Sequence, residues 1–342
     1  MKILNQVNYM GGLGADWWIG SGFKEAFEML GHEFFWYTAA DNLETRIREV
    51  SPDIILTSQS ELARGKLPLF LNARKKGVKV VMRVDSFFDQ DPLICNALVR
   101  ENPADIYFGE VEGSKMDGFK AMTGKPYVII ANAAHPKKHF PTAPVEKYAC
   151  DIVFMGAWMP NKREAFAKLL FPLIKKYRVR LYGPNWTLKD NTLRSLGLIA
   201  RKLHLFELSE RLQKLRLQVP AEEENQLYSS AKICINIHER GEHIGVLDHL
   251  ILNERTFKIP ACGGFEICDF VPPVRNYFTE DEMVMADDAH GDWVADWFKK
   301  IDYYLHHPDE RKKIQEKGTR RALRDHTYKN RVALLFSLLN IK

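Results

Sequence analysis

Short apolar runs alternate with amphipathic segments along the first half of the chain. The apolar runs are rich in valine, isoleucine and aromatic residues and predict strands, whereas the segments between them have helical periodicity and often end at glycine. Strands joined by crossover helices form a parallel sheet. The predicted strands are 1–9, 33–38, 53–58, 78–85, 104–110 and 125–133, and the predicted helices are 22–32, 43–52 and 67–77.

The same alternation restarts in the second half and ends in three consecutive amphipathic helices. The predicted strands are 150–158, 178–186, 232–239 and 264–269, and the predicted helices are 161–177, 222–231, 252–263, 293–307, 308–325 and 327–340. Two such halves predict an α/β fold of two Rossmann-like domains facing a cleft, with C-terminal helices closing the chain. Ligands in doubly wound sheets bind beyond the carboxyl ends of the strands.

The stretch His135–Ala149 separates the two patterns, because it has three prolines and few large apolar residues. We therefore predict an N-terminal domain over 1–140, a linker over 141–149 and a C-terminal domain over 150–328. The terminal helix, 329–342, is expected to pack back toward the N-terminal domain.

Residues 187–218 interrupt the alternation of strands and helices with a leucine-rich segment that holds seven basic and three acidic residues. Such a segment could lie on an anionic membrane surface or hold a lipid-linked acceptor. The alternative is a solvated helical hairpin that covers its own domain.

Composition excludes several classes of protein. The chain has 342 residues, 46% hydrophobic and 27% charged, which is typical of a globular protein of two domains. A net charge of +5 is too small to indicate nucleic-acid binding. Five cysteines without a CxxC pair indicate free thiols in a reducing compartment, and the histidines lack metal-site spacing, so no metal is expected. The N-terminus does not resemble a signal peptide and no apolar run could span a membrane, so we predict a cytosolic protein.

The stretch "NERTFKIPACGGFEICD", 253–269, is the strongest candidate for binding a charged ligand. Asn253 can cap a helix on which basic side chains stand one turn apart, and these could bind a diphosphate. The paired glycines would let a ligand approach the backbone closely. The candidates are Glu254, Arg255, Lys258, Gly263 and Gly264.

Other polar residues of the second half follow predicted strands and should lie at the same edge of its sheet. Asn236 and His238 end one strand, and His238 could donate to a phosphate or sugar oxygen. The strand-glycine-helix order around 156–163 would bring Asn161, Lys162 and Arg163 to an anion. Trp186 offers a face for stacking on a base or sugar.

The first half offers candidates for a second substrate and for a catalytic base. The loop after the first strand contains Gly12 and Gly14 but lacks dinucleotide-binding spacing, and Trp17 and Trp18 could form an acceptor platform or pack in the core. Asp85 follows the fourth predicted strand and is the first choice for the base, with Asp16 and Asp89 as alternatives. Asp85 could equally be a cap or turn residue.

Four passages of the second half together resemble the GT-B glycosyltransferases, in particular the group related to CgeB-type spore-maturation proteins. They are "DIVFMGAWMPNKRE", "LYSSAKICINIHE", "ERTFKIPACGGFEICD" and "HPDERKKIQEKGTRRALRDHTYKNRVALL". The resemblance covers most of residues 150–340. It implies a nucleoside-diphosphate sugar as donor and co-substrate, no cofactor, and transfer to a hydroxyl of a glycan, lipid-linked glycan or protein without an essential metal.

In that resemblance, Arg255 and Lys258 would neutralise the departing diphosphate. The sequence departs from the family pattern at Lys258, where many GT-B enzymes have a glutamate that holds the donor ribose. Lysine cannot accept those hydrogen bonds, although Glu254 could substitute. Two alternatives stay open, a nucleotide-sugar epimerase on the same fold and a non-catalytic glycan-binding or structural protein with a degenerate donor site.

Overall fold

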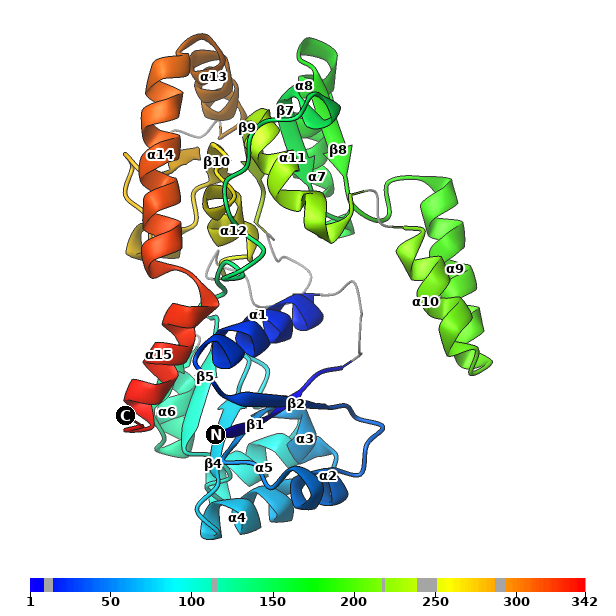
Figure 1. Cartoon of the computed structure of the whole chain (residues 1–342), viewed down its shortest axis with the longest axis vertical. Helices are drawn as coiled ribbons and strands as arrows, with labels where there is room; N and C mark the ends of the chain where they lie inside the picture. The colour runs from blue at the N-terminus through cyan, green and yellow to red at the C-terminus, as the bar shows by residue number, and fades with distance from the viewer. Residues whose placement is uncertain (9–14, 112–115, 217–218, 239–250, 287–292, 342) are drawn as a thin grey trace. The chain divides into compact units, whose positions relative to one another are not determined.

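The computed structural model describes residues 1–8, 15–111, 116–216, 219–238, 251–286 and 293–341, which form two compact units. The first unit comprises Met1–Pro136 and Tyr328–Lys342, and the second comprises Lys137–Thr327. The chain therefore passes between the units twice, and the first break lies a few residues before the predicted linker (Figure 1). No helix in the described ranges is long and apolar enough to cross a bilayer.

The first unit is built on a six-stranded parallel sheet in the order β2-β1-β3-β4-β5-β6. Its strands are β1 (Lys2–Gln6), β2 (Glu33–Tyr37), β3 (Ile54–Ser58), β4 (Lys79–Arg83), β5 (Ile106–Gly109) and β6 (Tyr127–Ile129). Its helices are α1 (Ala15–Met29), α2 (Leu43–Val50), α3 (Ser60–Ala63), α4 (Leu67–Lys75), α5 (Pro92–Arg100), α6 (Asp117–Thr123) and α15 (Tyr328–Leu338).

The second unit repeats this plan with five parallel strands in the order β11-β10-β9-β7-β8. Its strands are β7 (Cys150–Met155), β8 (Val179–Tyr182), β9 (Ala231–Asn236), β10 (Glu266–Asp269) and β11 (Val284–Ala286). Its helices are α7 (Arg163–Ala165), α8 (Phe171–Lys176), α9 (Leu188–Lys202), α10 (Phe206–Lys214), α11 (Glu224–Ser230), α12 (Arg255–Ala261), α13 (Trp293–His306) and α14 (Pro308–Asp325). A π-helical turn at Phe166–Leu170 joins α7 to α8, and short 3₁₀ turns occupy Glu146–Tyr148, Pro160–Lys162, Ala221–Glu223 and Pro272–Asn276.

The predicted fold class, two parallel α/β halves with helices at the C-terminal end, is confirmed. In each sheet the order in which the chain adds strands reverses at one point. This point lies between β1 and β3 in the first unit and between β7 and β9 in the second. Crossovers leave on opposite faces of the sheet at such a point, so the loops diverge and open a crevice at the carboxyl ends of the strands. These two edges are therefore the places to look for binding sites.

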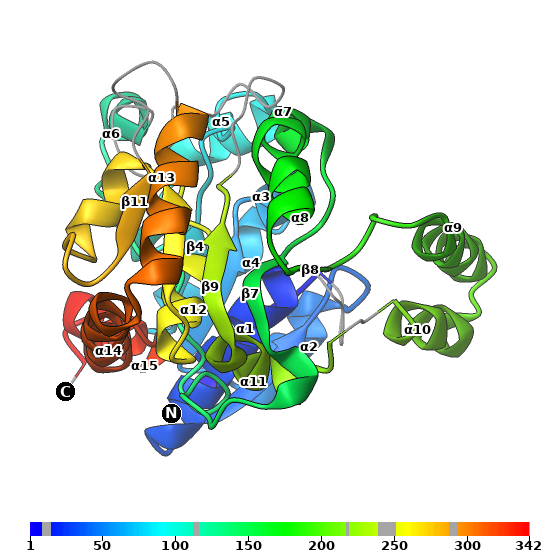
Figure 2. The same cartoon turned by 90° about the horizontal axis from the view of Figure 1, so that it is seen from above.

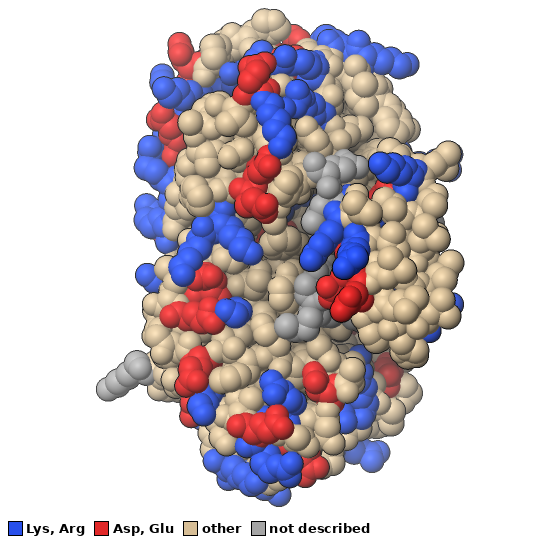
Figure 3. All heavy atoms as spheres, turned by 45° about the vertical axis from the view of Figure 1, so that its right-hand side comes forward, with Lys and Arg blue, Asp and Glu red and all other residues tan. Residues whose placement is uncertain are grey.

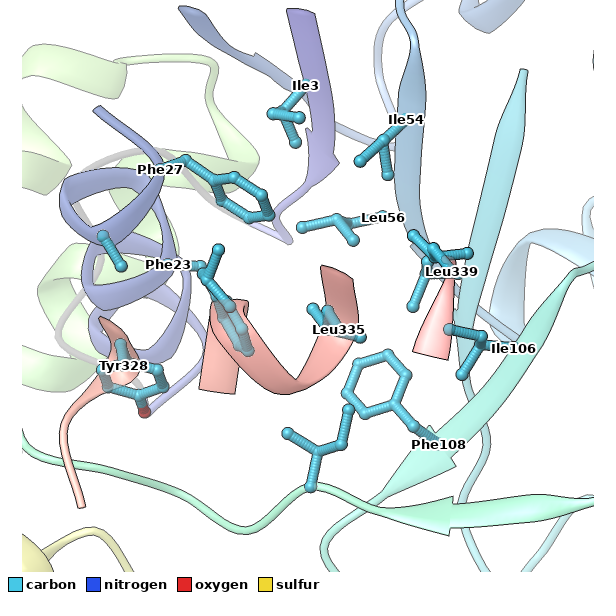
Figure 4. Packing of buried hydrophobic residues seen from close by; sticks show 14 of the residues in the cluster. Ile3, Phe23, Phe27, Ile54, Leu56, Ile106, Phe108, Tyr328, Leu335 and Leu339 are labelled. Atoms are coloured by element: carbon cyan, nitrogen blue, oxygen red, sulfur yellow. The ribbon is translucent and has the colours of Figure 1, made fainter. Parts of the chain in front are cut away.

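The last helix of the chain completes the core of the first unit. Tyr328, Leu335 and Leu339 are buried against Phe23 and Phe27 of α1 (Figure 4). Helix α1 begins at Ala15, seven residues before the predicted start, and it contains Gly22 because a Cβ there would overlap the ring of Tyr328. The pattern in the sequence missed this start because the glycines in the helix resemble a loop.

Candidate active site

Arg255 lies at the switch point of the second sheet and joins the ends of its two central strands. Its Nη1 donates to the carbonyl of Met155 at the end of β7 (2.6 Å), and its Nη2 donates to the carbonyl of Ile237 just after β9 (3.3 Å). The Lys162 ammonium, which is buried, also donates to the Ile237 carbonyl, at 2.9 Å. Two cations thus converge where an anionic ligand of a doubly wound sheet is expected.

The loops that follow β7 and β8 pack against each other beside Arg255. The Gly156 N–H donates to Tyr182 O (2.8 Å), and the Trp186 indole donates to Gly156 O (2.7 Å). A Cβ on Gly156 would overlap the Arg255 guanidinium, and one on Gly183, where φ is +123°, would overlap the Gly156 backbone. Both positions therefore require glycine because of close approach.

A buried polar network positions the first turn of α12. The Asn236 side chain accepts from Arg255 Nε (3.1 Å) and donates to Thr256 Oγ1 (3.2 Å). His238 Nδ1 lies 2.7 Å from Asp269 Oδ1, and its Nε2 lies 2.9 Å from Thr256 Oγ1. Thr256 Oγ1 can accept from the Asn236 amide and donate to His238 Nε2, which leaves His238 Nδ1 to donate to Asp269 Oδ1.

Beneath this network, Glu266 is buried at 3% exposure, and Asn236 Nδ2 donates to its Oε1 at 2.8 Å. Its Oε2 has no hydrogen-bond partner among the described residues. Burial raises the pKa of Glu266 to about 8, although the Asn236 hydrogen bond and the Arg255 charge oppose the shift. Glu266 is therefore largely protonated at neutral pH, and it is a site residue that the sequence analysis missed.

Replacing Glu266 with glutamine is expected to raise the free energy of unfolding by about 4 kcal/mol at pH 8 and by less than about 1 kcal/mol at pH 5. The folded carboxyl binds its proton more tightly than the unfolded one, so stability falls as pH rises from about 4.5 toward about 8. Glutamine is neutral and still accepts from Asn236. Urea unfolding at both pH values measures the effect, and an equal change at both would contradict it.

Lys258 is held by carboxylates one turn further along α12. Its ammonium forms an ion pair with Glu224 of α11 (2.5 Å) and lies 3.9 Å from Glu254. Burial alone would lower the pKa of Lys258, but Glu224 and Glu254 together raise it. For Glu224 the effects are opposite: burial would raise its pKa, but the positive charge of Lys258 and a hydrogen bond from His139 hold the pKa at about 2. Lys258, at which the sequence departs from the GT-B pattern, is thus paired with the buried carboxylate of Glu224 on the neighbouring helix.

The structure gathers some of the predicted site residues and separates others. Helix α12 begins at Arg255, one residue later than the predicted cap at Asn253 implies, so Glu254 and not Asn253 is its N-cap residue. The Asn253 Oδ1 still accepts from the Thr256 N–H in the first turn, at 3.3 Å. The paired glycines lie at the opposite end of α12, because the helix runs back across the sheet. A Cβ on Gly263 would approach Pro141, and one on Gly264 would approach Ile259. These two glycines therefore serve packing contacts far from the Arg255 end.

Further candidates in the second unit differ in exposure. Arg163 is exposed at the start of α7, and Asn161 Oδ1 is buried without a partner among the described residues. The Trp186 ring packs on Phe166, with centroids 4.9 Å apart, so that ring is engaged within the unit. His238 is fully buried with both ring nitrogens in hydrogen bonds, so it positions α12 and does not face a ligand.

A cavity of about 910 Å³ opens at the carboxyl ends of β1, β3 and β4 in the first unit. Asp16 and Asp85 both line it, together with the Arg83–Glu110 ion pair (3.0 Å). Amide side chains and apolar residues make up much of the remaining wall, including Gln6, Gln59, Gln90, Asn132, Phe87, Leu93 and Phe108. This mixture suits a ligand with several hydroxyl groups and apolar faces.

Asp85 is the more open of the two aspartates in this cavity. Its Oδ1 accepts from Gln59 Nε2 (2.7 Å) and from the Phe87 N–H (2.9 Å), so the turn role is confirmed. Its Oδ2 has no partner among the described residues, and the side chain is exposed. Asp16 Oδ2 instead accepts from the Asn8 N–H at 2.7 Å. A base must reach the proton that it removes, which favours Asp85.

The predicted acceptor platform is only partly described. Gly12 and Gly14 lie outside the described residues. Trp17 and Trp18 lie in α1, and Trp17 stacks on Trp36 of β2 with ring centroids 5.2 Å apart. Neither tryptophan is among the residues that line the cavity.

Comparison with known proteins identifies the family. Residues 162–337, just over half of the chain, match the family described as "Glycosyl transferase-like", so the chain belongs to that family. Comparison with curated protein sequences finds no match.

Solved structures share the fold over almost the whole chain. Sucrose-phosphate synthase from Thermosynechococcus elongatus superposes with a TM-score of 0.60 at 12% identity, covering 99% of both chains. Anabaena Alr3699/HepE in complex with UDP gives 0.63 at 12% identity, covering 98% of this chain and 100% of the other. A glycosyltransferase from Rickettsia africae gives 0.61 at 13% identity, covering 100% and 99%. The architecture is therefore that of the GT-B glycosyltransferases.

Proposed function

We propose that the protein transfers a sugar from a nucleoside-diphosphate sugar to an acceptor hydroxyl, with the donor bound by the second unit. The observation that carries this proposal is the convergence of Arg255 and Lys162 on the carbonyl of Ile237, at the switch point of the second sheet. Guanidinium and ammonium groups fixed at that edge can stabilise the charge that develops on a departing diphosphate. The family assignment supports the same chemistry.

The donor is proposed to be a UDP-sugar, because Anabaena Alr3699/HepE was solved with UDP. The acceptor, a hydroxyl of a glycan, lipid-linked glycan or protein, is proposed to bind the cavity of the first unit, where Asp85 would remove the hydroxyl proton. Metal independence belongs to the proposal, with fixed cations in the role that a metal ion plays elsewhere. The CgeB-like subgroup and membrane contact through 187–218 remain predictions from the sequence.

Saturating UDP is expected to raise the melting temperature of the wild-type protein by roughly 5–10 °C, and this shift should be lost in Arg255→Ala. A ligand at a hundred times its dissociation constant stabilises its site by about 2.7 kcal/mol, which corresponds to about 2–4 °C per kcal/mol for a domain of this size. A thermal-shift panel of UDP, GDP, ADP, dTDP and CMP measures the effect, each shift being taken from the melting temperature of the same variant without ligand.

Arg178→Ala is the matched control, because Arg178 is exposed and directly precedes β8. It therefore lies at the amino ends of the strands of the same sheet, whereas Arg255 lies at their carboxyl ends. This control variant should retain the full shift. No shift with any nucleotide would overturn the transferase proposal and favour the glycan-binding alternative. Incubation with the donor then separates the enzymes, since slow hydrolysis or transfer supports a transferase and an isomerised sugar supports an epimerase.

A further inference from the structure

The helices α9 and α10 form a hairpin that lies to one side of the strands of the second unit (Figures 1 and 2). Gly197 and Ala200 of α9 are buried against α10, and Ser209 Oγ donates to Gly197 O at 3.0 Å. None of the residues of α10 is buried. The predicted helical hairpin is thus confirmed, but most of its surface does not cover the domain that carries it.

A buried ion pair fastens the base of the hairpin to the unit. Arg216 Nε donates to Asp190 Oδ1 at 2.8 Å, with the two side chains 8% and 5% exposed. Burial would raise the pKa of Asp190, but Arg216 and the Asn185 N–H outweigh it and lower the pKa. The hairpin is therefore held in a defined orientation at its base.

One face of the hairpin consists of large apolar side chains. At 3.6 residues per turn, the exposed apolar residues of α9 other than Leu198, together with its C-cap Leu203, fall within about 80° of one another. Leu208 of α10 and its C-cap Leu215 fall within about 20°, whereas the exposed Phe206 points to the other side of α10.

The helices meet at Gly197 of α9 and at Ser209, Leu212 and Gln213 of α10. Both stripes are rotated by about 100° in the same sense from these contact faces, so in an antiparallel pair they lie on the same side of the hairpin. The members of this leucine face are 46–87% exposed and comprise Leu188, Leu196, Ile199, Leu203, Leu208 and Leu215.

Figure 3, which turns the hairpin side of the molecule toward the viewer, shows a broad area without charged side chains on its right. Monomeric proteins rarely expose an apolar surface of this kind without a binding role. The hairpin also contains seven Lys and Arg residues against three Asp and Glu, and the basal ion pair takes one of each, which leaves six basic and two acidic residues. An apolar face on a basic helical element is complementary to anionic lipid.

The charge argues against a second copy of the chain as the occupant. Two hairpins joined through their leucine faces would bring the same basic side chains together, and this repulsion would weaken the dimer. An anionic bilayer surface accepts leucine side chains below the headgroups and lysine and arginine at headgroup level. We propose that the leucine face of the α9–α10 hairpin docks on an anionic lipid surface.

Two adjacent residues of α9 give a matched test. Ile199 belongs to the leucine face and is 53% exposed, whereas Leu198 is 50% exposed and points to the other side of the helix. Ile199→Glu should lower the partition coefficient of the full-length protein onto phosphatidylglycerol-containing vesicles about tenfold, while Leu198→Glu should leave it within about twofold. Both variants change charge and hydrophobicity equally, and circular dichroism checks that both fold.

Cosedimentation with vesicles of phosphatidylglycerol and phosphatidylcholine, and with pure phosphatidylcholine, measures the partition. Binding by the wild type to anionic vesicles only, lost in Ile199→Glu, would support the proposal. Absent binding, equal loss in both variants or equal binding to neutral vesicles would overturn it. A wild-type dimer in light scattering that becomes a monomer in Ile199→Glu would assign the face to a second copy and also overturn it. No sugar transfer is measured, so the result is independent of the proposed activity.

Discussion

Replacing Asp85 with asparagine is expected to lower kcat for sugar transfer by about 10²–10⁴-fold, the range for loss of a general base. Asparagine keeps Oδ1, which accepts from Gln59 and the Phe87 N–H, so the turn should survive. It replaces Oδ2, the atom open to the cavity, with an amide that cannot take a proton. The thermal shift with UDP should remain at its wild-type value, because the proposed donor site lies in the other unit.

Asp89→Asn is the control for this prediction, because Asp89 is exposed in the same loop but does not line the cavity. It should change kcat less than twofold, in line with an aspartate that does not contact substrate. If Asp16→Asn shows the large loss and Asp85→Asn does not, the base is Asp16 and not Asp85. Initial rates at saturating donor, measured as release of the nucleoside diphosphate, distinguish the variants.

Replacing Glu224 with glutamine is expected to lower the free energy of unfolding at pH 7 by about 3–5 kcal/mol, because it leaves the buried Lys258 ammonium without its main partner. In the wild type, the folded pKa of Glu224 is about 2 and lies below its unfolded value. The stabilisation by Glu224 is therefore fully present above about pH 4.5 and is lost as pH falls toward about 2. Urea unfolding at pH 7 and pH 3 should show a smaller difference between variant and wild type at pH 3.

The double variant Glu224→Leu, Lys258→Met should recover most of this loss, since a buried pair can be replaced by apolar side chains of similar volume. Glu222→Gln, two residues earlier and exposed, should change the free energy of unfolding by less than about 0.5 kcal/mol. A Glu224→Gln variant as stable as the wild type would show that Lys258 finds water or another acceptor. The ion pair would then have no structural role.

The periodicity of the sequence predicted the fold well, because parallel strands are continuous apolar runs and their helices have a clear apolar face. It missed β11, which spans only Val284–Ala286, and α5, which begins with Pro92 after the cap of Asp91. A strand as short as β11 depends on neighbours that are distant in sequence, and a local pattern contains no record of them. α5 is as long as α4, but no glycine such as Gly77 follows it to mark its end in the sequence. The start of α1 was missed because Gly20 interrupts the helical pattern, and that glycine is explained only by its close approach to Trp36 of β2.

Site residues that directly follow a strand could be predicted from the sequence. Site residues whose hydrogen-bond or ion-pair partners are distant in the sequence were harder to predict. Arg255, Lys162 and Asn236 converge because they stand at strand ends or the start of a helix, as the order of elements implied. Glu224 was missed although Leu227 and Tyr228, three and four positions later, mark a buried helix face. Glu266 gave no signal, because nothing in a single sequence distinguishes a buried carboxyl in a short strand from an exposed one.

The packing of α15 into the first unit has a consequence for how the chain acquires its structure during synthesis. A domain at the beginning of a chain usually folds while the rest is still being translated. Here the core around Phe23 and Phe27 lacks Tyr328, Leu335 and Leu339 until the chain has been synthesised past residue 339. The second unit, whose residues 137–327 are continuous, can close first. The first unit begins earlier along the chain, but its core is therefore completed after the second unit has been synthesised.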